Sequence, residues 1–220
     1  MKIRVIVTGA TGMVGEGVLL ECLQHDSVEH VLVIGRKSCE RNHPKLEEIL
    51  VEDLADLSSV TSRLKNYDGC FFCAGVSSIG MKEEKYYRLT YTLTMEFAKT
   101  LAAINPGMTF CYVSGGGTDS SEKGRMMWAR VKGKTENDLA KLPFKSTYNF
   151  RLGMARPSPG MKNVLPLYRY VGWLAPFISA VAPNVISTLT ELGLAMINAV
   201  LKGYEKQVLE VKDIKKLAKE

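Results

Sequence analysis

The hydrophobic pattern of the chain alternates short apolar runs with longer stretches whose apolar residues recur at helical spacing. Ile3, Val5 and Val7 lie in a first apolar run, and the run at 30–35 is a continuous one of the kind typical of strands covered on both faces. Strands alternating with helices predict an α/β fold with a doubly wound parallel sheet and helices on both faces. Further strands are predicted at 46–51, 69–75, 108–114, 145–151 and 208–211, and helices at 57–64, 82–104 and 122–141.

The character of the chain changes after Arg156, where Pro157, Ser158, Pro159 and Gly160 follow. We predict one domain over residues 1–220, with 157–205 as a small C-terminal helical lobe. Residues 170–190 carry no charge, which is long enough to suggest a transmembrane helix. Prolines and hydroxyl residues interrupt this stretch, so it favours short buried helices, and we expect no membrane contact.

A glycine turn separates the first predicted strand from the first helix. Its glycines have a G-x-x-G-x-x-G spacing: Gly9 allows the sharp turn, Gly12 lets a pyrophosphate approach the backbone, and Gly15 lets the helix pack on the strand. Free N–H groups at the helix start then face the phosphates. The alternative is a tight structural turn, but the strand–turn–helix context favours a Rossmann-like dinucleotide site. Its predicted cofactor-binding residues are Thr8, Gly9, Thr11, Gly12, Met13, Val14 and Gly15.

Arg36 and Lys37 follow the second predicted strand, where a site for NAD(H) would place an acidic residue. Two cations there favour the 2′-phosphate of NADP(H) over NAD(H), although a basic surface turn would look the same. Asp53 ends the third strand and is either an acceptor for the adenine amino group or a helix cap. Small residues at the end of the fourth strand are expected beside the cofactor: Cys73, Ala74 and Gly75.

The composition bears on four further questions: nucleic-acid binding, the cellular compartment, redox chemistry and metal binding. The net charge is +6, but no basic stripe interleaved with aromatic residues suggests nucleic-acid binding. Five cysteines in an odd count predict a reducing compartment and a cytoplasmic location without a signal peptide. Cys70 and Cys73 form a C-x-x-C within an apolar run, which favours buried small hydrophobic residues over a redox or zinc site. The three histidines have no ligand at metal-binding spacing, so no metal site is expected.

Three residues in the middle of the chain are candidates for chemistry. Ser114 lies at the carboxyl end of the fifth strand, where open α/β sheets bind ligands. Trp128 and Lys132 lie one turn apart on one side of the following helix. The alternatives are a strand-end serine bonded to local backbone and a solvated lysine.

The glycine turn with Arg36, Asp53, Ser114 and Lys132 resembles the short-chain dehydrogenase/reductase superfamily. The short length and the sequence around Lys132 look most like its atypical branch, related to Tat-interacting-protein-type oxidoreductases and often labelled NAD-dependent epimerase/dehydratase. The resemblance implies a serine that orients the substrate carbonyl, a tyrosine that moves the proton, and a lysine four residues later that also binds the cofactor. Ser114 and Lys132 match, but Trp128 stands at the tyrosine position.

An indole N–H donates hydrogen bonds but cannot act as a general acid or base. The proton could come from Tyr112, Tyr87, Lys132 or ordered water. The first hypothesis is therefore an NADP(H)-dependent oxidoreductase for a small carbonyl or alcohol, and a homo-oligomer is compatible with it. The alternatives are an NADP(H)-sensing regulatory protein with little or no catalysis, and an epimerase or dehydratase.

Overall fold

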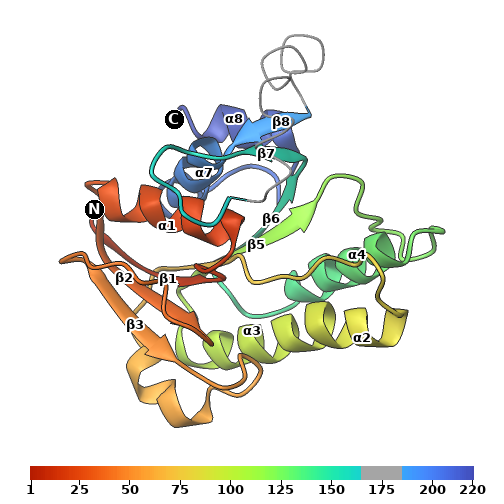
Figure 1. The fold of residues 1–220 in the computed structure, drawn as a ribbon, viewed down its shortest axis with the longest axis horizontal. Helices are drawn as coiled ribbons and strands as arrows, with labels where there is room; N and C mark the ends of the chain where they lie inside the picture. The colour runs from red at the N-terminus through yellow and green to blue at the C-terminus, as the bar shows by residue number, and fades with distance from the viewer. Residues whose placement is uncertain (165–184) are drawn as a thin grey trace.

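The computed structural model describes residues 1–164 and 185–220, and it places a parallel sheet at the centre of the molecule (Figure 1). Its seven strands run in the order β3-β2-β1-β4-β5-β6-β9, and every pairing is parallel. The order reverses between β1 and β4, so a crevice opens at the carboxyl ends of these strands. The strands are β1 (Ile3–Thr8), β2 (Val28–Gly35), β3 (Leu46–Leu50), β4 (Gly69–Phe72), β5 (Thr109–Gly115), β6 (Ser146–Leu152) and β9 (Val208–Leu209).

Helices cover both faces of this sheet, as the apolar strands predict (Figure 1). On one face lie α1 (Met13–Gln24), α7 (Leu189–Leu201) and α8 (Val211–Leu217), and on the other η1 (Ser58–Leu64), α3 (Leu93–Ile104) and α4 (Met127–Leu139). Val5 and Val7 belong to the core under α1, whereas Ile6 belongs to the opposite core. Side chains of successive strand residues point to opposite faces, so each strand serves two cores. The predicted doubly wound α/β fold is therefore confirmed.

The long helix predicted at 82–104 is interrupted. It consists of α2 (Glu83–Tyr87), a π-helical turn η2 (Arg88–Thr92) and α3. The Thr94 hydroxyl donates to the Thr90 carbonyl within this wider turn. The apolar residues at helical spacing therefore predicted the helix but not its change of pitch.

Two further predicted boundaries were wrong because a side chain binds the backbone N–H groups at each of them. The strand predicted at 69–75 ends at Phe72, because the Thr8 hydroxyl accepts hydrogen bonds from the backbone N–H groups of Cys73 and Ala74, both at 3.1 Å. The helix predicted from residue 122 begins at Met127. Before it, the Asp119 carboxylate accepts hydrogen bonds from the N–H groups of Ser121 and Gly124, which forms a compact turn.

The predicted lobe at 157–205 includes α7, and this helix packs directly against α1. A Cβ atom on Gly17 would lie 2.6 Å from Cβ of Leu189, and one on Gly193 would lie 2.7 Å from Cβ of Glu21. The two glycines thus allow close contact of the helices. Residues 165–184 of the lobe, with most of the uncharged stretch, lie outside the described residues, so the lobe as a separate unit stays a prediction.

Two short strands, β7 (Met154–Arg156) and β8 (Ile186–Thr188), form a separate parallel pair before α7. Within residues 1–164 and 185–220, no helix combines the length and the apolar character needed to cross a membrane.

Candidate functional site

The glycine turn between β1 and α1 has a separate steric reason for each glycine. Gly9 has φ +72°, and a Cβ there would lie 2.7 Å from the Cys73 carbonyl carbon and oxygen. A Cβ on Gly15 would lie 2.2 Å from the Gly9 carbonyl oxygen, whereas one on Gly12 would meet its nearest atom at 3.5 Å. Gly9 and Gly15 are therefore required by the fold, but Gly12 is not. Its lack of a side chain leaves room for a ligand.

The start of α1 is open to such a ligand. Gly12 is the N-cap residue and supplies no side-chain hydrogen bond to the first turn. The first N–H groups of a helix have no partner within the helix, and the helix dipole makes them attractive to an anion. The turn thus offers a phosphate free backbone N–H donors, the positive end of the helix dipole and a backbone that no side chain covers.

A cavity of about 530 Å³ lies in front of this turn, at the carboxyl ends of β1, β2 and β4. This is within the range of small-molecule sites. It brings together eight of the predicted cofactor-binding residues: Gly9, Thr11, Gly12, Arg36, Lys37, Cys73, Ala74 and Gly75. The other predicted cofactor residues are outside its lining: Thr8, Met13, Val14, Gly15, Asp53 and Lys132.

Residues missed by sequence reasoning complete the lining. Leu89 and Leu93 face the cavity, together with Leu54 and Val76. Leu89 and Leu93 lie four residues apart in the helix predicted at 82–104, a spacing that is typical of a stripe facing the core. The π-helical turn and the half-buried state of both leucines were the signals that distinguish cavity lining from core, and both require the structure.

Arg36 and Lys37 are exposed at the end of β2. In the parts of the chain that the structure describes, neither side chain is joined to a carboxylate in an ion pair. Asp53 is also exposed, and its carboxylate accepts a hydrogen bond of 2.9 Å from the Ala55 N–H. Asp53 therefore closes its own turn, and its neighbour Leu54 lines the cavity.

Ser114 lies at the carboxyl end of β5 and is 4% exposed. Its hydroxyl is 3.0 Å from the Thr118 hydroxyl, which donates its own proton to the Gly115 carbonyl at 2.7 Å. Because Thr118 has one proton, Ser114 is the donor in their shared hydrogen bond. Ser114 can donate a hydrogen bond to a substrate carbonyl only when its hydrogen bond to Thr118 is broken.

Trp128 and Lys132 lie beside the same strand end. A Cβ on Gly115 would lie 3.4 Å from Cζ3 of Trp128 and 3.9 Å from Cδ of Lys132, so both side chains pack over this glycine. Lys132 Nζ donates to the Val113 carbonyl at 3.2 Å and lies 5.1 Å from the centre of the Tyr112 ring. Burial lowers the pKa of Lys132 to about 8. The structure thus brings Ser114, Trp128 and Lys132 to one end of β5.

The tyrosines considered as proton donors are poorly suited to that role. Tyr112 is 1% exposed, and burial raises its pKa well above the usual value. Tyr87 contacts Tyr91 with tilted rings whose centres are 4.6 Å apart, at the junction of α2 and η2. The Tyr91 hydroxyl in turn donates to Asp138. Neither Tyr87 nor Tyr112 is among the residues that line the cavity.

The cysteines behave as buried hydrophobic residues. Cys70 is fully buried, and burial raises the pKa of the Cys73 thiol to about 12. A high pKa disfavours the thiolate that redox chemistry and metal binding both require. This supports the packing interpretation of the C-x-x-C over a redox or zinc site.

A buried carboxylate ties the start of α1 to a distant segment. Glu16 is 1% exposed, forms an ion pair with Arg41, and accepts hydrogen bonds from the N–H groups of Lys162 at 2.8 Å and Asn163 at 2.6 Å. These donors hold the pKa of Glu16 below its usual value against the opposing effect of burial. Helix α1 and residues 162–163 are thereby connected.

We expect Glu16→Ala to lower the free energy of unfolding by about 3 kcal/mol, because the backbone N–H groups of Lys162 and Asn163 and the half-buried Arg41 guanidinium lose their shared acceptor. Urea unfolding checks this, with Glu96→Ala as control, since the exposed Glu96–Lys99 pair should contribute less than about 1 kcal/mol. The lowered pKa means that the contribution of Glu16 is present at neutral pH and lost as pH falls through its folded-state pKa. Equal losses in the two variants would contradict this account.

Comparison with known proteins gives a consistent result. A model of the NAD dependent epimerase/dehydratase family matches residues 5–119. "Protein fmp52-1, mitochondrial" of Aspergillus terreus is 28% identical over 217 residues, which cover 93% of this chain and 90% of that protein. The corresponding protein of Emericella nidulans is 25% identical over 222 residues, with the same coverage of both chains. These names place the relatives in mitochondria, which contradicts the cytoplasmic location expected from the sequence.

Solved structures share the fold at low sequence identity. The Bordetella bronchiseptica enzyme WbmF in complex with NAD⁺ superposes with a TM-score of 0.68 at 15% identity, covering 99% of this chain and 77% of that one. UDP-N-acetylglucosamine 4-epimerase from Methanobrevibacter ruminantium M1 gives a TM-score of 0.67 at 16% identity, covering 98% and 81%. The strand order, the glycine turn and the family match over residues 5–119 agree: this chain belongs to the NAD dependent epimerase/dehydratase family.

Proposed function

We propose that this protein is an NADP(H)-dependent oxidoreductase of the atypical short-chain type, which acts on a small carbonyl or alcohol. The cavity that joins the glycine turn to Arg36 and Lys37 carries this proposal. In it, Gly12 and the start of α1 bind the pyrophosphate, and the two cations bind the 2′-phosphate of the adenosine ribose. Bound nicotinamide supplies or accepts the hydride, and the protein orients the reactants.

The end of β5 provides the reacting part of the site. Ser114 breaks its hydrogen bond to Thr118 and donates to the substrate oxygen instead, which orients the substrate. Lys132 lies where the family places its ribose-binding lysine, and Trp128 covers Gly115 and Gly117 as an apolar wall. An epimerase acting on a nucleotide sugar has less support, because such chemistry also needs a proton-transferring group and Trp128 occupies the position of the tyrosine.

The cofactor preference is tested by Arg36→Asp. We expect this variant to weaken NADP(H) binding by about 10- to 100-fold, because a phosphate loses a charge-assisted partner and meets a like charge. Binding of NAD(H) should change little. Fluorescence titration with both cofactors measures the difference, and Lys212→Asp on α8 makes the same charge change on an exposed residue far along the chain. Equal loss for both cofactors would show that the 2′-phosphate is bound elsewhere.

Turnover separates this proposal from the regulatory alternative. With saturating NADPH and a broad panel of small aldehydes and ketones, we expect stoichiometric oxidation of NADPH that Ser114→Ala strongly reduces. A protein that binds NADPH tightly but leaves the whole panel unchanged would instead fit the sensing protein that Trp128 suggests.

A further inference from the structure

One face of α4 carries Trp128, Lys132 and Glu136 at intervals of four residues, so they are neighbours along the helix. Lys132 is held over the end of β5 by the Val113 carbonyl and the Tyr112 ring. Glu136, one turn further on, is 2% exposed. A buried carboxylate so close to an ammonium would normally keep that ammonium fully protonated.

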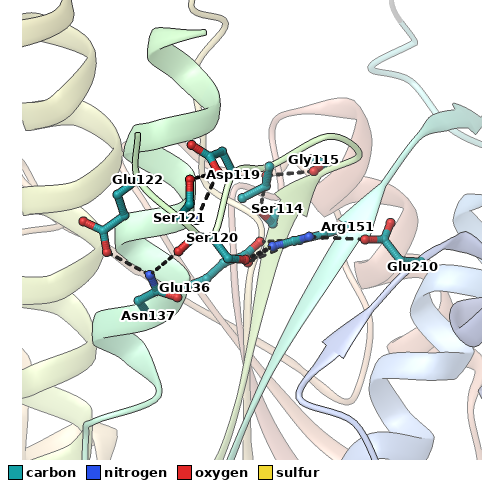
Figure 2. Close-up of polar contacts among 11 residues, drawn as sticks. Ser114, Gly115, Asp119, Ser120, Ser121, Glu122, Glu136, Asn137, Arg151 and Glu210 are labelled. Carbon is teal, nitrogen blue, oxygen red and sulfur yellow. Dashed lines mark hydrogen bonds and ion pairs between the residues drawn. The ribbon is translucent and has the colours of Figure 1, made fainter. Parts of the chain in front are cut away.

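Arg151 of β6 forms an ion pair with this carboxylate and offsets part of its charge. Its Nε lies 3.1 and 3.3 Å from the two Glu136 oxygens, and its Nη2 lies 2.6 Å from one of them (Figure 2). Nη1 also reaches Glu210 at 3.3 Å, and Nη2 donates to Ser120 at 2.5 Å. Figure 2 shows the guanidinium between the carboxylates of Glu136 and Glu210. Arg151 therefore weakens, but does not cancel, the effect of the Glu136 charge on Lys132.

The other groups at the end of β5 are poor proton donors. The Ser114 proton is directed to Thr118, and the Trp128 indole does not exchange a proton at neutral pH. Tyr112 is buried in the core, and burial raises its pKa. Lys132 is the group in this part of the described chain whose chemistry suits proton transfer.

We propose that Lys132 supplies the proton in the reaction, in place of the missing tyrosine, and that the buried Arg151–Glu136 ion pair is the positioning device that sets its charge. This inference rests on the oxidoreductase function proposed above. In reduction, the carbonyl carbon takes the hydride that bound NADPH would supply on its oxidation to NADP⁺, and the carbonyl oxygen takes a proton from Lys132 Nζ. The C=O double bond becomes an alcohol, and the neutral amine then recovers a proton from water.

The electrostatics of the site agree with this role. Burial lowers the pKa of Lys132 to about 8, and the charge of Glu136 opposes part of that shift. Facing Lys132 in the described residues are Glu136 from α4, the Tyr112 ring from β5 and, through Glu136, Arg151 from β6. A proton donor works best when its pKa lies near the working pH. Lys132 is then mostly protonated at neutral pH but releases its proton readily.

Removing one partner of the ion pair should move the pKa of Lys132 in a direction that identifies the partner. Arg151→Met leaves the Glu136 charge unopposed, so we expect the pKa to rise by about one unit or more. Glu136→Gln removes the anion, so the pKa should fall below the wild-type value. A control is Asp138→Asn, on the same helix: Asp138 pairs with Lys134 and Lys141, so the pKa of Lys132 should stay constant.

The experiment is an NMR titration of the full, cofactor-free chain labelled with ¹³C at lysine Cε, with the Lys132 signal assigned from Lys132→Arg. A Lys132 signal that titrates with the exposed lysines, or that Arg151→Met leaves unmoved, overturns the proposal. Because a single variant of a buried ion pair can fail to fold, the double variant Glu136→Gln/Arg151→Met is measured as well. With neither charge present, its Lys132 pKa should fall below that of the wild type, and an unchanged value also overturns the proposal.

The pH profile of NADPH oxidation gives the second measurement. Its alkaline limb should lie near the NMR pKa of Lys132 in the wild type and move with that pKa in each folded variant. A limb that stays in place while the pKa moves shows that another group donates the proton. Absence of turnover with every substrate would refute the oxidoreductase function, whereas the NMR titration still decides whether the ion pair sets the charge of Lys132.

Discussion

Gly12→Ala should weaken NADP(H) binding by about 10- to 100-fold, the loss expected when a pyrophosphate can no longer reach its backbone donors. The folded protein should be unaffected. The added Cβ would meet its nearest neighbour, the Gly9 carbonyl oxygen, at 3.5 Å, which is an ordinary contact. Fluorescence titration with NADPH and thermal unfolding without cofactor measure the two properties separately.

Gly15→Ala is the matched comparison, because its Cβ would lie 2.2 Å from the Gly9 carbonyl oxygen. This variant should lose stability as well as affinity, by about 1–3 kcal/mol, since the turn must move away from α1. Gly107→Ala, where a Cβ meets nothing within 4 Å, should change neither property. If Gly12→Ala binds NADPH as tightly as the wild type, the pyrophosphate does not lie against this turn.

Lys132→Met should reduce carbonyl reduction by about 10²- to 10⁴-fold, the usual effect of removing an acid or base group. Methionine approximates the length of the lysine stem, so packing against Gly115 and the Tyr112 ring is largely retained. Removing a buried charge should also leave stability equal or higher. Single-turnover oxidation of NADPH measures the chemical step apart from binding.

Trp128→Tyr provides the converse change. It puts a phenol at the position where the family places its proton donor, four residues before Lys132. In the double variant Trp128→Tyr/Lys132→Met, this phenol should restore part of the turnover only if Lys132 is not also needed to hold the cofactor. In the otherwise unchanged protein we expect Trp128→Tyr to retain or raise activity. Normal turnover of Lys132→Met with Trp128 in place would contradict the role given to Lys132.

Much of the fold could be predicted because its causes are local. The apolar runs of β1 and β2 mark strands covered on both faces, and the glycines at 9, 12 and 15 have spacings set by the backbone of one turn. Arg36 and Lys37 could be placed at the cavity because they directly follow a strand whose carboxyl end borders it. Strand position along the chain fixes which end of a parallel sheet a residue reaches.

Other predictions failed because they depend on partners remote in sequence or on what a helix face contacts. Phe72 ends β4 because the hydroxyl of Thr8, far earlier in the chain, takes the next two N–H groups. Leu89 and Leu93 lie at core spacing, yet they line the cavity beside the π-helical turn. Helical periodicity reports which residues share a face, but not what that face contacts.

The sequence by itself determined the parallel α/β architecture and the glycine turn after β1, and it predicted Trp128 at the tyrosine position, because each follows from residues adjacent along the chain. Only the tertiary structure decided the charge environment of Lys132. It brings Arg151 of β6 against Glu136 of α4, and it seals Glu16 against residues 162–163. Electrostatic effects depend on distance and burial in space, and neither quantity is contained in the order of residues.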